Sequence, residues 1–214
     1  MSDEQPFSDL EATLKKAAAA LRGAGVPFLL GGSLASWARG GPESRHDLDL
    51  MIKRADAERA LAALTEAGLR AEHPPEEWLV KAWDGDVLVD LIFSPKGLEI
   101  DDEVLARGDE MSVLSMQMRV MAIEDVLITK LMAITEQHLR FDGPLAIARS
   151  LREQVDWPQV RAATAGSPFA RAFFVMAEGL GIVPAEPRAA HAGAAREPRV
   201  RVVTTSGSQG AAEG

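Results

Sequence analysis

Asp47 and Asp49 stand one residue apart in an apolar stretch of the sequence, a spacing that suits metal chemistry. In a β-strand, residues i and i+2 point to the same face, so the two carboxylates would emerge side by side. Paired like charges on a half-buried strand are unfavourable unless a cation neutralises them. Mg²⁺ commonly combines one or two carboxylates with substrate phosphates. The alternative interpretation is an exposed strand face or a pair of surface salt bridges.

A third aspartate, Asp90, lies in the otherwise apolar run 87–93. An ionised carboxylate in a core strand is costly unless it is paired or bound to a metal. If this strand lies beside the strand of Asp47 and Asp49, the three acids converge, and two metal ions could activate a hydroxyl and clamp a departing pyrophosphate. Asp90 would then help to deprotonate that hydroxyl. The alternative is an aspartate at a strand edge that is bonded to arginine or to the backbone.

The turn Gly31-Gly32-Ser33 ends a hydrophobic run and precedes a predicted helix. Glycine allows a positive φ and a close approach of the backbone to a ligand. The N–H groups at the start of the helix would face an anion, and the Ser33 hydroxyl would add a donor. The alternative is a plain strand-to-helix turn in which Ser33 caps the helix.

Periodicity and turn residues predict an α+β fold, in which a small mixed sheet with flanking helices precedes a helical subdomain. The predicted strands are 27–30, 46–52, 78–83, 86–93 and 116–121. The predicted helices are 8–23, 33–39, 54–67, 123–136, 145–154, one that begins at Asp156, and 168–180. We therefore expect a core over residues 1–121 and a helical subdomain over 122–183. Residues 184–214 are rich in Ala, Gly, Pro, Arg and Ser, which predicts a disordered tail.

The composition is that of a globular protein, because 47% of the 214 residues are hydrophobic. The chain has no cysteine, which excludes disulfides and thiolate metal sites. The formal net charge of −9 disfavours a broad grip on nucleic acid, although a local basic patch stays open. The N-terminus is polar and no apolar run approaches the roughly 20 residues of a membrane span, so we expect a cytoplasmic protein without membrane contact.

Together the turn 31–33, the pair Asp47 and Asp49, and Asp90 resemble the signature of the polymerase-beta-type nucleotidyltransferase superfamily. Within it, the chain resembles small bacterial AbiEii-like and minimal nucleotidyltransferases. The segment 122–130 is similar to the helix that carries a lysine to the nucleotide in those proteins. The resemblance covers about residues 8–182.

The resemblance implies transfer of a nucleoside monophosphate from an NTP, such as ATP, to an acceptor hydroxyl, with release of pyrophosphate and two Mg²⁺ ions as cofactors. It places Asp47 and Asp49 on both metals and Asp90 on the catalytic metal. Gly31, Gly32 and Ser33 would form the turn at the β- and γ-phosphates, and Lys130 would offset phosphate charge.

Several side chains have two interpretations. Lys130 either offsets phosphate charge or is a solvated lysine on an amphipathic helix. Arg45 and His46 either contact the triphosphate or acceptor, or lie on the surface. Trp78 and Trp83 either stack on a base or serve packing.

The acceptor stays open between a tRNA end, a partner protein and a small molecule, and a toxin–antitoxin partner fits the resemblance. A catalytically inactive module that senses nucleotide or binds protein is the alternative function, and a phosphohydrolase is a third. The presence of all three acids favours the transferase.

Overall fold

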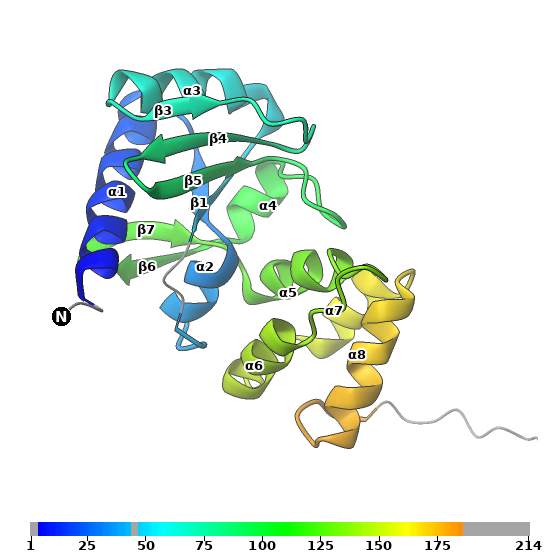
Figure 1. Cartoon of the computed structure of the whole chain (residues 1–214). Helices are drawn as coiled ribbons and strands as arrows, with labels where there is room; N and C mark the ends of the chain where they lie inside the picture. The colour runs from blue at the N-terminus through cyan, green and yellow to red at the C-terminus, as the bar shows by residue number, and fades with distance from the viewer. Residues whose placement is uncertain (1–3, 44–46, 186–214) are drawn as a thin grey trace, which may run out of the picture. The chain divides into compact units, whose positions relative to one another are not determined.

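The structure, a computed structural model, describes residues 4–43 and 47–185. Helices and strands are mixed up to Val120, and the elements from Ile123 onward are helices (Figure 1). The strands are β1 (Phe28–Leu30), β2 (Leu48–Ile52), β3 (Arg70–Glu72), β4 (Leu79–Asp84), β5 (Val87–Ile92), β6 (Asp109–Val113) and β7 (Met116–Val120). The helices are α1 (Glu4–Gly23), α2 (Gly32–Ala38), the 3-10 turn η1 (Arg54–Asp56), α3 (Ala57–Glu66), α4 (Asp102–Arg107), α5 (Ile123–Met132), α6 (Asp142–Leu151), α7 (Trp157–Thr164) and α8 (Pro168–Gly179).

The strands form one seven-stranded mixed sheet in the order β3-β4-β5-β2-β1-β7-β6. The pairs β2–β5 and β1–β7 are parallel, and the other neighbours are antiparallel. The predicted α+β class with a mixed sheet is therefore confirmed. A tight turn joins β4 to β5, and Gly85 supplies the positive φ of +60° that this turn requires.

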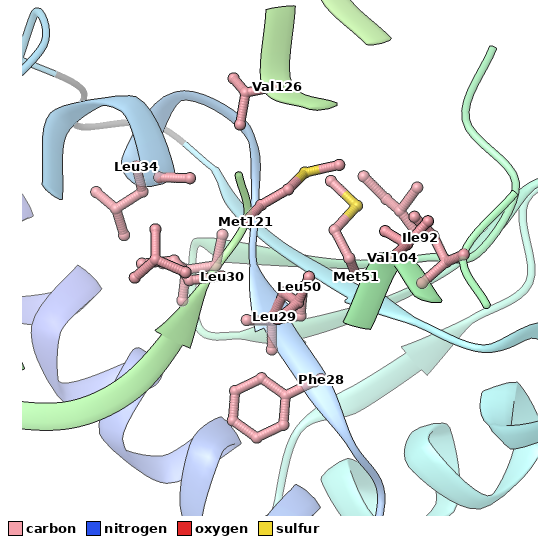
Figure 2. Packing of buried hydrophobic residues seen from close by; sticks show 14 of the residues in the cluster. Phe28, Leu29, Leu30, Leu34, Leu50, Met51, Ile92, Val104, Met121 and Val126 are labelled. Atoms are coloured by element: carbon pink, nitrogen blue, oxygen red, sulfur yellow. The ribbon is translucent and has the colours of Figure 1, made fainter. Parts of the chain in front are cut away.

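Apolar side chains from the central strands and their covering helices form the core. Along β2, Leu48, Leu50 and Ile52 point to one face, and Asp49 and Met51 point to the other. Figure 2 shows Met51 beside Ile92 of β5, the residue opposite it in the parallel register. The polar Asp49 therefore belongs to a strand whose other residues are fully buried.

Helices α1 and α3 pack against each other and contact the β4–β5 region of the sheet. Helix α5 packs against α2 and is itself surrounded by α6, α7 and α8 (Figure 1). Two helices in this group begin with side-chain caps, from Asp156 to the amide of Gln159 and from Ser167 to the amide of Ala170. The arrangement places α5 against the turn between β1 and α2.

The first helix begins at Glu4, earlier than the predicted start at Ser8. Pro6 then falls in the first turn, where the missing N–H of proline breaks no helical hydrogen bond. Strands β3 and β6 and helix α4 were not predicted. Both strands lie at the edges of the sheet and expose most of their residues, so they carry no strong apolar alternation.

The described residues up to Pro184 belong to one compact unit, and the predicted division at residue 121 stays a prediction. Most of the predicted tail, beyond Ala185, lies outside the described residues. Within the described part of the chain, no helix combines the length and the apolar character needed to cross a bilayer.

Candidate functional site

Asp49 and Asp90 lie side by side on neighbouring parallel strands, because they are direct partners in the β2–β5 register. The pKa of Asp49 is raised to about 7, with burial as the largest cause; the charges of Asp90 and Asp47 add to this rise, and the charges of Lys130 and Lys81 oppose it. Burial also raises the pKa of Asp90, although Lys81 opposes this shift. The structure therefore brings two acids together at a place where ionisation of both carboxyl groups is energetically unfavourable.

Asp47 directly precedes β2, which starts two residues later than the sequence predicts, and its side chain is exposed. Its negative charge nevertheless acts on both Asp49 and Asp90. The three predicted acids consequently share one region, in which Asp47 is on the solvent side.

Lys81 of β4 lies opposite Asp90 in the antiparallel β4–β5 register. Its Nζ is 3.3 Å from Asp90 Oδ1, an ion-pair distance at which the two groups do not reach hydrogen-bond geometry. Asp90 Oδ1 is buried and has no hydrogen-bond partner among the described residues. A buried carboxylate oxygen without a donor is unusual and indicates that the group has another task.

Gly32 is required by the close approach of the Asp49 carboxylate. A Cβ atom at position 32 would lie 1.6 Å from Asp49 Oδ2, and the residue has a φ of +56°. Gly31 is constrained as well, because its N–H donates to the Asp49 carbonyl at 2.8 Å and an added Cβ would lie 2.3 Å from Met51 Cε. Both glycines thus serve to bring the turn after β1 against β2.

Ser33 does not cap the helix that follows it. Helix α2 begins at Gly32 with Gly31 at the cap position, and no side chain bonds to its first amides. The Ser33 hydroxyl instead accepts a hydrogen bond of 3.0 Å from Lys130 Nζ on α5. Burial lowers the pKa of Lys130, and the nearby Asp49 charge opposes that shift.

A cavity of about 380 Å³ opens over these groups. Its wall is formed by β2, the start of α2, helix α5, the residue before β4, and the end of β5 with the turn that follows it. The lining residues are Gly32, Asp49, Met51, Trp78, Ile92, Ser94, Pro95, Lys96, Thr129, Lys130 and Ala133. Five of the predicted residues, Gly31, Gly32, Ser33, Asp49 and Lys130, therefore line this cavity or contact a residue that does.

Comparison with known proteins adds the family. A protein-family model described as "Nucleotidyl transferase of unknown function (DUF2204)" matches residues 10–162. The chain belongs to this family. It is therefore a nucleotidyltransferase, an enzyme that transfers a nucleoside monophosphate from a nucleotide donor, and the predicted enzyme class is confirmed.

Two solved structures are similar to this chain. The solution structure of the antibiotic-resistance factor ANT(2'')-Ia has a TM-score of 0.55 at 17% identity and covers 82% of this chain and 98% of its own. The crystal structure of ANT(2'')-Ia in complex with adenylyl-2''-tobramycin has a TM-score of 0.46 at 19% identity, with coverages of 80% and 97%. A comparison with curated proteins finds no match. The first structure supports the nucleotidyltransferase fold, and the AbiEii-like subtype stays a prediction.

The donor atoms of this nucleotidyltransferase suit a hard divalent cation. Among the described residues, no three His, Asp or Glu side chains already surround a common point that could hold an ion. However, the acids supply oxygen ligands, Asp49 and Asp90 repel each other, and Asp90 Oδ1 lacks a donor. The chemistry of the residues therefore fits Mg²⁺.

Two predicted residues cannot be placed: Arg45 and His46 lie outside the described residues. Lys81 was not predicted and forms an ion pair with Asp90. Trp78, one of the two predicted candidates for base stacking, lines the cavity. Lys81 could have been found by counting back from the Gly85 turn, because hairpin register places it opposite Asp90. No comparable sequence signal distinguishes Trp78 from Trp83, whose indole donates to Glu72 Oε2 at 2.7 Å.

Proposed function

We propose that this nucleotidyltransferase uses Mg²⁺ to transfer a nucleoside monophosphate from an NTP to an acceptor hydroxyl, with pyrophosphate as the second product. The observation that carries the proposal is the pairing of Asp49 with Asp90 beside a cavity that Gly32 and Lys130 also line. Adjacent acids, a close backbone approach and a half-buried cation are the parts that a metal-bound triphosphate needs.

The residues divide into two groups. Asp47, Asp49 and Asp90 would hold two Mg²⁺ ions, which when bound neutralise phosphate charge and polarise the acceptor hydroxyl. Gly32 and Ser33 lie at the β- and γ-phosphates of the donor, and Lys130 binds the same phosphates from α5. Support for the second group comes from the Lys130–Ser33 hydrogen bond, which fixes the ammonium beside the turn.

Bond making and breaking occur at the α-phosphorus of the donor. The acceptor oxygen forms a bond to the α-phosphorus, and the bond from this phosphorus to the oxygen that bridges to the β-phosphorus breaks. Pyrophosphate leaves with that electron pair, and Asp90 Oδ1, which has no hydrogen-bond donor, accepts the proton of the acceptor hydroxyl.

A transfer assay with an α-labelled NTP tests this assignment. Each of the four NTPs is incubated with Mg²⁺ and three acceptor pools: RNA, protein that includes any small antitoxin-like partner, and small molecules. We expect label in one pool, and Asp90→Asn should lower the rate by about 10²–10⁴-fold, the usual contribution of a general base.

The matched control is Asp86→Asn, a change at an exposed turn residue between β4 and β5. It should leave the rate unchanged. Label transfer that persists in Asp90→Asn would contradict the role of this acid. An enzyme that binds NTP but labels none of the pools would contradict the proposed reaction.

A further inference from the structure

Trp78 is an exposed aromatic side chain on the wall of the cavity. Its exposed fraction is 40%, and the other large hydrophobic residues of comparable exposure in the described part of the chain, Leu139, Val175 and Leu180, are aliphatic. Burial of an indole is worth more than burial of most side chains, so its exposure beside Asp49 needs an explanation. A ligand that stacks on the ring provides one.

Hydrogen bonds hold the backbone at Trp78 against the end of β5. The Trp78 carbonyl accepts hydrogen bonds from the amides of Phe93 at 3.1 Å and Ser94 at 3.2 Å. The following turn is anchored on α5, because Gly97 packs so closely that an added Cβ would lie 2.6 Å from Met132 Cγ. The backbone that carries the indole is therefore tied to the sheet and, through this turn, to α5.

The strand registers place Trp78 away from the phosphate end of the cavity. Met51 and Ile92 pair two residues beyond Asp49 and Asp90, in the C-terminal direction of both strands. Leu79 pairs with Ile92, so Trp78 lies at the next level along the sheet. The cavity thus extends from Gly32, Lys130 and Asp49, over an apolar floor of Met51 and Ile92, to Trp78.

The proposed reaction decides which substrate occupies the Trp78 end. Phosphoryl-type transfer is an in-line displacement, so the attacking and leaving oxygens lie on opposite sides of the reacting phosphorus. If Lys130 and Ser33 hold the leaving pyrophosphate, the acceptor approaches from the Trp78 end. This step rests on the proposed function.

A cation lines the same part of the cavity wall as Trp78. This residue is Lys96, on the anchored turn after β5. The acid Glu99 accepts a hydrogen bond from Ser94 Oγ and lies 3.7 Å from Arg54 Nε. Two further acids, Glu76 and Glu77, directly precede Trp78 and are exposed outside the lining. The lining at this end therefore offers a flat aromatic surface and a cation.

We infer that the Trp78 end binds an acceptor that presents a planar ring for the indole and an anionic group for Lys96, next to its reactive hydroxyl. A nucleotide with a free ribose hydroxyl has all three features. One stacking side chain and one lysine match a single nucleotide, which is consistent with a chain of net charge −9. The nucleotide is either free or the end of an RNA strand.

The test compares three acceptor probes: AMP, a ten-nucleotide RNA with a free 3′ hydroxyl, and tobramycin as a polycation without a planar aromatic ring. Transfer from an α-labelled NTP gives KM and kcat for each acceptor, and thermal shift gives the Kd of the NTP separately. We expect AMP or the RNA to be labelled, and their difference identifies the free nucleotide or the strand end as the source.

Trp78→Ala should raise the KM of that acceptor by about tenfold or more, the scale of a lost base stack. The NTP Kd should stay within about twofold. Trp78→Phe should restore most of the KM, Lys96→Gln should raise it, and Trp83→Phe, at an indole outside the cavity, should not.

Three results would overturn the inference: labelling of tobramycin alone, no labelling of any probe by an enzyme that binds NTP, or a Trp78→Ala effect on the NTP Kd in place of the acceptor KM. Failure of the wild-type protein to bind any NTP would instead contradict the proposed function.

Discussion

Asp49 is the residue whose ionisation the fold opposes most clearly. Its pKa is about 7 in the folded protein, against an ordinary value of 3.8, with burial as the largest cause. Between these values the folded state binds more protons than the unfolded state. The stability of the metal-free protein should therefore fall as the pH rises from about 4 to about 7 and stay low above that.

Asp49→Asn removes this ionisation and should stabilise the metal-free protein at pH 8. We expect a gain of about 2 kcal/mol, because each tenfold difference in acidity is worth about 1.4 kcal/mol and neighbouring groups relax. This corresponds to a rise in Tm of roughly 4–8 °C. Thermal unfolding in EDTA between pH 4 and pH 8 measures the effect.

The gain from Asp49→Asn should vanish near pH 4, where the wild-type carboxyl is protonated in both states. Asp47→Asn, at the exposed acid, is the control and should change Tm much less. Parallel pH profiles for the wild type and Asp49→Asn would contradict the assigned burial of this carboxylate.

Gly32 makes a second prediction at the scale of single residues. Gly32→Ala puts a methyl group onto Asp49 Oδ2 and forces an L side chain to a φ of +56°, so the turn must move away from β2. We expect a loss of about 1–3 kcal/mol in unfolding free energy and a large loss of transfer activity. Urea denaturation and the transfer assay measure the two effects.

Gly143→Ala is the matched control for Gly32→Ala. Gly143 lies in α6, and an added Cβ at this position would meet no atom within 4 Å. This substitution should leave activity intact and, as a glycine-to-alanine change within a helix, add up to about 1 kcal/mol of stability. Equal behaviour of the two alanine variants would disprove the close approach at Gly32.

At the scale of secondary structure, the β4–β5 hairpin brings Lys81 to Asp90. Both side chains are largely buried, with exposed fractions of 21% and 13%. Lys81→Met leaves the Asp90 carboxylate without its cation, so we expect a loss of about 1–2 kcal/mol in the metal-free protein, less than for a fully buried pair. Chemical denaturation in EDTA measures the loss.

Asp90→Asn in the Lys81→Met background should recover most of that stability, because the unpaired charge is then absent. The double-mutant cycle thus isolates the interaction from the packing of the lysine stem. Simple additivity of the two single substitutions would show that the ion pair contributes nothing to the hairpin.

At the scale of the whole molecule, a hydrogen bond between distant segments links α5 to the start of α2. Lys130 Nζ on α5 donates to Ser33 Oγ, 97 residues away in sequence. Lys130→Met keeps the length of the side chain but removes the cation beside the α2 turn. We expect the NTP Kd to rise by about tenfold, as for the loss of a charge-assisted hydrogen bond to phosphate.

Thermal shift with increasing NTP measures the Kd of Lys130→Met. The control is Lys15→Met, which removes an exposed lysine that pairs with Glu11 on α1 and should leave the Kd unchanged. An unchanged Kd in Lys130→Met would place the phosphates elsewhere.

Much of the molecule could be predicted because strong local patterns specify it. The apolar runs around Asp49 and Asp90 identify both central strands, and the Gly31-Gly32 turn identifies the start of α2. The edge strands β3 and β6 escaped prediction because solvent covers most of their residues, which removes the apolar alternation.

Other features of the site depend on tertiary contacts that no local pattern records. The sequence predicts that the Ser33 hydroxyl caps a helix, but in the structure it accepts a hydrogen bond from Lys130 on α5. Trp78 and Trp83 are both candidates for base stacking in the sequence, yet only the structure shows that Trp78 lines the cavity. Pairings of this kind need the assembled sheet and helices.

Thermal unfolding with each of the four NTPs, with and without Mg²⁺, tests the central claim most directly because it needs no acceptor. At an NTP concentration 100 times its Kd, binding adds about 2.7 kcal/mol, which raises Tm by roughly 5 °C or more. We expect such a shift for at least one NTP, and only when Mg²⁺ is present. The Tm of Asp49→Asn with NTP and Mg²⁺ should equal the Tm of the same variant without ligand. No shift with any NTP, or an equal shift in Asp49→Asn, would contradict a metal-bound triphosphate between these acids.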